Sequence, residues 1–279
     1  MVLLKALLTM MCLTQLALLS GCTNLIFQPN NVRYYTPESF DIKHEEVFMK
    51  TRDNLRLHGW WLKSGPAKKA NIIYLHGNAQ NISSHVANVA WLTKQGYDVF
   101  IFDYRGYGYS QGEVDLAGIM HDAMDAIAYG AERSAREDIP VYVMAQSLGA
   151  SLAVYAVASS EFKEKIKALM IVSAFSDFHN ITREVLSNWW LTWALQWPLS
   201  FTVNNDFRPL DHVANITPVP LAVLHSREDE IIPYHHATDL FEAATQPKTF
   251  IEITGSHNAA FVVENNKNLI IKYLDGLLK

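Results

Sequence analysis

Three residues that are far apart in the sequence could act together in nucleophilic catalysis: Ser147, Asp229 and His257. A serine hydroxyl is a poor nucleophile until a neutral imidazole takes its proton, and an imidazole keeps the useful tautomer when a carboxylate holds its other nitrogen. Ser147 lies in "AQSLG", which differs at one position from G-x-S-x-G, the nucleophile elbow that exposes a serine between a strand and a helix. Because Ser and Gly also mark ordinary turns, this motif alone does not identify a catalytic serine.

The elements around these residues predict a doubly wound α/β domain. Short apolar runs predict strands at 72–75, 99–102, 141–144, 169–172, 221–224 and 250–253. Stretches with helical periodicity lie between most of them, at 83–94, 116–133, 148–159 and 236–244, and 261–278 closes the chain. Apolar strands without alternation are typical of a parallel sheet buried on both faces. Before this pattern begins, 46–50 and 55–62 flank a turn and predict a β-hairpin.

The candidate residues fall where such a sheet binds ligands, which is beyond the carboxyl ends of its strands. The apolar runs are followed in turn by "HGNA", "DYRGYGYSQG", Ser147, Asp229 in "DEIIP" and His257 in "GSH". With these motifs, the sequence resembles the α/β-hydrolase superfamily of serine hydrolases over almost the whole mature chain. It is most similar to a subgroup that includes lipid and acyl-ester hydrolases and relatives of prolyl-type aminopeptidases.

The resemblance implies an α/β-hydrolase fold, with a mostly parallel sheet, the N-terminal hairpin and a helical cap. It also implies the roles of the site residues. Ser147 is expected to be the nucleophile, His257 the base and Asp229 the acid that orients it, while the backbone N–H groups of Asn78 and Leu148 form the oxyanion hole. The family needs no cofactor for this chemistry, and we expect none.

Three features leave alternatives open. Glu228 and Glu230 adjoin Asp229 and could replace it as the acid, although Asp229 is the residue that matches the D-x-x-I-P pattern. Ala145 occupies the first glycine position of the elbow, where one additional methyl group can fit. Gln80 stands where a glycine often follows "HGNA", which could alter the loop near the oxyanion donors without removing a backbone N–H.

The stretch from about 175 to 209 interrupts the alternation of strands and helices, and such long insertions often form lids. It contains Trp189, Trp190, Trp193, Trp197 and Phe201. Three of the tryptophans recur at a spacing of four, which keeps them near one helical face. We expect a cap in which Trp193 and Trp197 contact substrate, and the alternative is that they pack on the core of the domain.

The N-terminus predicts export and lipidation. Residues 1–21 have a basic start, a short apolar core and small residues before Cys22, as in a secretory signal peptide. "LSGC" resembles the bacterial lipobox, which implies acylation of Cys22, for example with palmitate, and a membrane anchor in the bacterial cell envelope. Thr23 suggests the outer membrane facing the periplasm, by resemblance to enterobacterial sorting. We expect residues 22–43 to be a tether and residues 44–279 to be the hydrolase domain.

Composition and spacing argue against other classes. The net charge of −5 is mild, and the sequence has no Lys/Arg cluster suited to nucleic acid. His225, His235 and His236 lie close to Asp229 in the sequence, but their spacing does not match a metal-binding helix, so no metal site is predicted.

The sequence therefore predicts a membrane-anchored serine hydrolase that cleaves small-molecule or lipid esters through an acyl-enzyme. An aminopeptidase or amidase with the same triad is an alternative, because a fold does not determine its substrate. A binding lipoprotein without catalytic activity is an alternative from another class, although a binding scaffold has no physical need for Ser, Asp and His together. The sequence makes no prediction of the oligomeric state.

Overall fold

A computed structural model describes residues 27–188, 190 and 192–278. The predicted signal peptide, the predicted lipidation site Cys22 and one of the cap tryptophans, Trp189, lie outside these residues. Within the described ranges, no helix has the length and apolar character needed to cross a membrane.

The centre of the molecule is an eight-stranded sheet with the order β10-β9-β8-β7-β4-β6-β3-β2. Its strands are β2 (His44–Lys50), β3 (Arg56–Leu62), β4 (Ala70–Leu75), β6 (Tyr97–Phe102), β7 (Val141–Gln146), β8 (Ile166–Val172), β9 (Leu221–Ser226) and β10 (Lys248–Ile253). Six neighbouring strands, β6, β4, β7, β8, β9 and β10, pair in parallel, whereas β3 is antiparallel to both β6 and β2. The predicted parallel sheet and N-terminal hairpin are therefore confirmed.

Helices cover both faces of the sheet. They are α3 (Ile82–Thr93), α4 (Leu116–Arg136), α5 (Leu148–Ala158), α9 (His235–Ala243) and α10 (Glu264–Gly276). Side chains of α4, α5 and α9 pack into one core cluster, and those of α3 and α10 pack into the other. Strand β4 serves both clusters, since Ile73 and Leu75 enter the first and Ile72 and Tyr74 the second. This alternation explains why the strand is apolar along its whole length.

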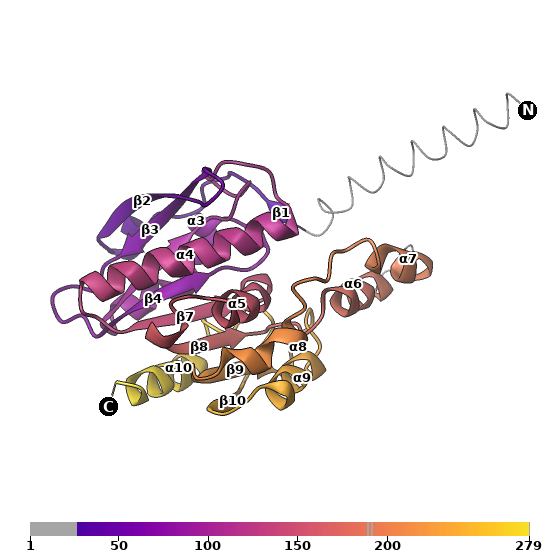
Figure 1. Ribbon diagram of the computed structural model, residues 1–279. Coiled ribbons are helices and arrows are strands. Elements are labelled where there is room, and N and C mark those ends of the chain that lie inside the picture. The colour runs from indigo at the N-terminus through magenta and orange to yellow at the C-terminus, as the bar shows by residue number, and fades with distance from the viewer. Residues whose placement is uncertain (1–26, 189, 191, 279) are drawn as a thin grey trace, which may run out of the picture.

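The expected insertion forms a small helical cap at one end of the molecule (Figure 1). It holds α6 (Phe178–Ser187), η3 (Trp193–Leu195) and α7 (Gln196–Ser200), and α8 (Pro209–His212) leads into η4 (Val213–Ile216). An ion pair closes its base, because Arg208 Nε lies 2.6 Å from Asp177 Oδ2. Asp177 also caps α6 by accepting a hydrogen bond from the N–H of Asn180.

The N-terminal segment differs from the expected tether. Residues 27–43 pack on the domain, with Phe27 and Ile42 buried. Strand β1 (Gln28–Pro29) pairs with β5 (Ala79–Gln80), and the short helix η1 (Pro37–Phe40) follows. The side-chain amide of Asn81 donates hydrogen bonds to the carbonyl oxygens of Asn30 and Val32. Residues 27–43 are therefore part of the folded domain and not the free tether that we expected.

Candidate active site

The topology brings the candidate residues to one edge of the sheet. Asn78 follows β4, Ser147 follows β7, Asp229 follows β9 and His257 follows β10. These strands are parallel, so their carboxyl ends lie at the same edge. Asn78, Ser147 and His257 line one pocket there.

Ser147 occupies a strained turn between β7 and α5. Its φ of 54° and ψ of −121° are rare for a residue with a side chain, and such strain is typical of functional turns. The N–H of Ser147 donates to the carbonyl oxygen of Val172, 2.8 Å away. At Gly149, a Cβ would lie 2.4 Å from the carbonyl oxygen of Leu75, so the helix can approach β4 only because this residue is glycine. The methyl group of Ala145 fits, since it is fully buried in the core.

The acid next to His257 is Asp229. Nδ1 of His257 lies 2.8 Å from Oδ2 and 3.0 Å from Oδ1 of Asp229. The two glutamates take other positions: Glu230 accepts from the backbone N–H of His257, and Glu228 accepts from the N–H of Gly255. The choice among the three acids is therefore made by the fold of the loop after β9.

The surroundings of Asp229 favour its ionised form. Burial by itself raises the pKa of Asp229, but hydrogen bonds from His257, Ile232 and Ser173 outweigh it, and the net pKa is below the ordinary aspartate value. Oδ1 accepts from the N–H groups of Ile231 and Ile232 at 3.0 and 2.8 Å. A charged, fixed carboxylate holds Nδ1–H of the imidazole and leaves Nε2 to accept a proton.

The loop with Asn78, one of the two predicted oxyanion donors, lies beside Ser147. A Cβ built on Gly77 would lie 3.6 Å from Cβ of Ser147. Asn78 is held by its side chain, whose Oδ1 accepts from the N–H of Gln28 at 3.2 Å and from the hydroxyl of Tyr107 at 3.0 Å. The N–H of Leu148 is the first of α5, at the positive end of the helix dipole. Tyr107 belongs to the "DYRGYGYSQG" motif, whereas no sequence motif pointed to Gln28.

Gln80 adopts the conformation that glycine favours at its position. Its φ is 68°, in the left-handed region, which costs a residue with a side chain more than it costs glycine. The carbonyl oxygen of Gln80 accepts from the N–H of Asn30, 3.3 Å away. The loop therefore keeps the turn conformation although Gln80 replaces glycine, and the hydrogen bond from Asn30 of the N-terminal segment stabilises it.

The pocket above Ser147 has a volume of about 410 Å³ and is mostly apolar. The cap contributes Phe178, Ile181, Val185, Leu186, Leu199 and Val203 to its wall. Among the described residues that line it there is no Asp, Glu, Lys or Arg. His85 is one of the polar residues in the wall, and burial lowers its pKa, which favours the neutral ring. The pocket is suited to a neutral, apolar group.

The two tryptophans that we expected to contact substrate do not line this pocket. Trp193 is 62% exposed and Trp197 is 56% exposed. The regular spacing suggested one continuous helix, but the chain breaks into η3 and α7, and α7 turns Leu199 rather than Trp197 toward the pocket. The apolar residues of α6 were the signal that sequence analysis missed.

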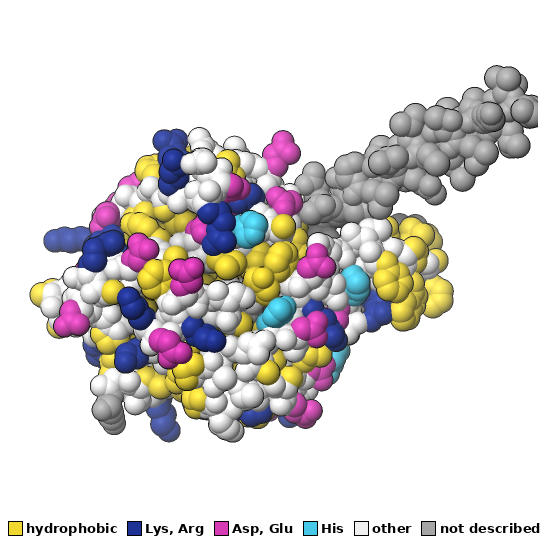
Figure 2. Space-filling view, in the orientation of Figure 1, with side chains coloured by type: hydrophobic (Ala, Val, Ile, Leu, Met, Phe, Trp, Pro, Cys, Tyr) yellow, Lys and Arg dark blue, Asp and Glu magenta, His cyan; other side chains and the backbone are white. Residues whose placement is uncertain are grey.

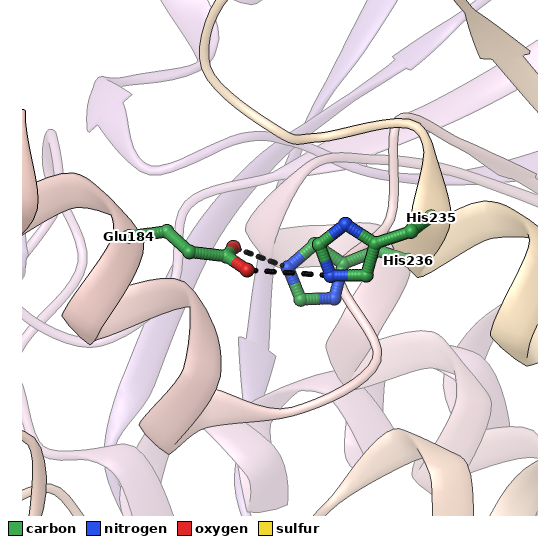
Figure 3. A group of neighbouring side chains, drawn as sticks. All are labelled: Glu184, His235 and His236. Carbon is green, nitrogen blue, oxygen red and sulfur yellow. Dashed lines mark hydrogen bonds and ion pairs between the residues drawn. The ribbon is translucent and has the colours of Figure 1, made fainter.

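A second cluster of polar groups lies between the cap and α9 (Figure 3). Glu184, His235 and His236 place one potential ligand atom each within 4.8 Å of one another. Nδ1 of His236 accepts from the backbone N–H of Ser176 at 3.1 Å, so the ring proton is on Nε2, which donates to Glu184 at 2.8 Å. Because that proton occupies the lone pair that a metal would need, the cluster is better described as a contact that holds α6 against α9.

Comparisons with known proteins agree with this fold. A family model described as serine aminopeptidase, S33, matches residues 66–211, a range that includes Ser147 and ends before Asp229 and His257. The uncharacterized protein YfhR of Escherichia coli O157:H7 is 31% identical over 243 residues, which cover 85% of this chain and 81% of YfhR. The α/β-hydrolase domain-containing protein WAV2 of Arabidopsis thaliana is 30% identical over 234 residues, 80% of this chain and 75% of WAV2.

A similar solved structure is that of the esterase Pf2001 of Pyrococcus furiosus. It superimposes with a TM-score of 0.75, covering 91% of this chain and 99% of the esterase, at 19% sequence identity. At that identity the likeness concerns the fold, which is the α/β-hydrolase fold.

Proposed function

Because this chain belongs to the α/β-hydrolase family described as serine aminopeptidase, S33, and is a serine hydrolase of that fold, we propose that it cleaves carboxylic esters with an apolar acyl part. We further propose that it does so at a membrane of the bacterial cell envelope, anchored through an acylated Cys22. The observation that carries the ester proposal is that His257, bound to Asp229, and the half-buried elbow serine Ser147 line the same apolar pocket.

The proposed reaction has two steps, acylation and deacylation of Ser147, and His257 acts as the base in both. Oγ of Ser147 attacks the ester carbonyl while Nε2 of His257 takes the hydroxyl proton, and the N–H groups of Leu148 and Asn78 hold the oxyanion. The alcohol leaves with the proton from His257, and the acyl group stays on Ser147. Water then attacks the acyl-enzyme while His257 takes its proton, and His257 returns that proton to Oγ of Ser147 as the carboxylic acid is released.

The pocket favours esters over the aminopeptidase substrates that the family description names. An aminopeptidase must bind the positively charged amino terminus of a peptide, and a buried ammonium group is costly unless a carboxylate pairs with it. The described residues that line this pocket include no carboxylate. A neutral ester with an apolar acyl chain needs no such partner.

A fluorophosphonate probe tests the proposal, because it labels an activated serine and thereby separates an enzyme from a binding lipoprotein. We expect labelling of the wild type, none of Ser147→Ala, and full labelling of Ser187→Ala, which removes a hydroxyl from the cap. The probe-reactive protein should then hydrolyse p-nitrophenyl esters of rising chain length and leave aminoacyl p-nitroanilides intact. Faster turnover of the anilides would overturn the ester assignment.

The anchor is tested separately. Cys22→Ala removes the only sulfur at the predicted lipidation site, so we expect the protein to leave the membrane fraction of cells that make the full chain. A variant that stays in that fraction without acylation would contradict the lipid anchor, whatever the outcome of the labelling.

A further inference from the structure

The outer face of the cap exposes an unusual number of large apolar side chains. This cap patch consists of Val185, Trp190, Trp193, Leu195, Trp197 and Phe201, which are 45 to 84% exposed. Figure 2 shows hydrophobic side chains gathered on the part of the cap that projects farthest from the domain. Soluble proteins rarely expose a large contiguous apolar surface, and such surfaces mark contacts with other molecules or with membranes.

Only one layer of structure separates this patch from the pocket. On α7, Leu199 lines the pocket, whereas Trp197 and the following Phe201 are exposed on the outside. On α6, Val185 belongs to both surfaces, since it lines the pocket and is 45% exposed. An apolar wall thus runs from the outer surface of the cap into the proposed acyl-binding space.

The first described residues lie at the same end of the molecule as the cap. The described chain begins at Phe27, and β1, which it precedes, lies on the side from which α6 and α7 project (Figure 1). Gln28 itself lines the pocket. Cys22 is only five residues before Phe27. Because five extended residues span at most about 18 Å, an acylated Cys22 must hold this end of the domain close to the bilayer.

We propose that the cap patch docks on the lipid bilayer to which the chain is anchored, so that the pocket takes its ester substrate at the membrane surface. This inference rests on the proposed anchor and ester function. Half of the six patch residues are tryptophan, the side chain that is enriched where a membrane meets water because its ring is apolar and its N–H is polar. A short lipid anchor beside the patch provides the second contact that stable membrane binding requires.

The test uses the full acylated protein in phosphatidylcholine vesicles whose chains carry bromine, which quenches tryptophan fluorescence on contact. We expect quenching of the wild type. The double variant Leu195→Gln, Phe201→Gln removes two apolar side chains from the patch but no tryptophan, and we expect it to lose the quenching. The matched control Phe48→Gln, Leu278→Gln removes an exposed Phe and an exposed Leu outside the cap, and it should be quenched like the wild type.

Equal quenching of the wild type and the patch variant would overturn the proposal, as would no quenching or no binding to the vesicles. A dimer in detergent that the patch variant abolishes, together with absent quenching, would assign the patch to a second copy instead. Fluorophosphonate labelling of the same detergent samples reports on the ester function independently. Melting temperatures in detergent verify that both double variants are folded.

Discussion

Nδ1 of His257 lies 2.8 Å from Oδ2 of Asp229, although the two residues are separated by 27 others in the sequence. The carboxylate is fixed from the other side by two backbone N–H groups of its own loop. The imidazole is fixed in turn, because its backbone N–H donates to Glu230 at 3.0 Å. One loop after β9 therefore sets both the tautomer of His257 and its position.

The contact between Asp229 and His257 predicts different effects of replacing Asp229 and its neighbour Glu228. Asp229→Asn keeps the shape of the side chain but replaces an acceptor oxygen with an amide, which favours the wrong tautomer of His257. We expect kcat to fall by about 10⁴-fold, the scale of this change in other triads. Glu228→Gln is the matched control and should change kcat by less than about 10-fold, because the Glu228 carboxylate accepts a hydrogen bond from the backbone N–H of Gly255 and not from the imidazole of His257. A comparable loss in Glu228→Gln would refute the assignment.

A second prediction concerns the elbow. Gly149→Ala adds a methyl group 2.4 Å from the carbonyl oxygen of Leu75 and 2.5 Å from that of His76, and neither backbone atom can move easily. We expect a lower melting temperature and weaker fluorophosphonate labelling, because α5 must shift and carry Ser147 with it.

Gly276→Ala serves as its control, since a Cβ at the end of α10 would meet nothing within 4 Å. Alanine is favoured over glycine in helices by up to about 1 kcal/mol, so this variant should melt at the same temperature or higher. If both variants lost melting temperature and labelling equally, the close contact of α5 with β4 at Gly149 would not be the reason that glycine is needed there.

A third prediction distinguishes the inner and outer faces of α7. Leu199→Ala removes apolar contacts from the pocket, and each buried methylene is worth about 0.8 kcal/mol. Loss of two or three such contacts should lower kcat/KM for a dissolved long-chain ester by roughly 10-fold or more relative to an acetate ester. Trp197→Ala should keep the wild-type dependence on chain length, because the side chain is outside the pocket. The reverse pattern would restore Trp197 as a substrate contact.

A fourth prediction concerns stability and pH. His58 is buried, with Nε2 2.6 Å from Glu46 and Nδ1 3.7 Å from Asp103. Burial lowers the pKa of His58, but the nearby carboxylate of Asp103 and the hydrogen bond to Glu46 outweigh it, and the net pKa is raised above 6.5. The stabilisation from this site is therefore complete below the unfolded pKa of about 6.5 and is lost as the pH rises through the folded value.

We accordingly expect the free energy of unfolding of the wild type to fall above about pH 6.5, measured by urea denaturation at several pH values. In His58→Gln this part of the slope should be absent, and in Glu46→Gln it should be smaller. An identical slope in all three proteins would show that His58 does not link protonation to folding.

Much of this architecture could be predicted from the sequence because its cues are local. The apolar runs after residue 70 gave the parallel strands, and the Gly and Ser positions around Ser147 gave the turn that α5 requires. The carboxyl ends of parallel strands lie at one edge of the sheet. Because Ser147, Asp229 and His257 each follow a predicted strand, the sequence was enough to predict that they lie close together. Helix ends were less certain: α4 begins at the predicted Leu116 but continues to Arg136, past the predicted end at residue 133.

The tertiary structure decided the directions in which individual side chains point and the contacts between segments that are distant in the sequence. Whether Asp229, Glu228 or Glu230 meets His257 depends on the path of one loop. The sequence favoured Asp229 only through its match to the D-x-x-I-P pattern, and the folded loop brings that residue to His257. The N-terminal segment was predicted as a tether, yet it binds Asn78 and Asn81, which are 50 and 51 positions away from their partners in the sequence and leave no local pattern. Trp193 and Trp197 are exposed because η3 and α7 are not one continuous helix, and helical periodicity gives a side chain's direction only while one helix continues.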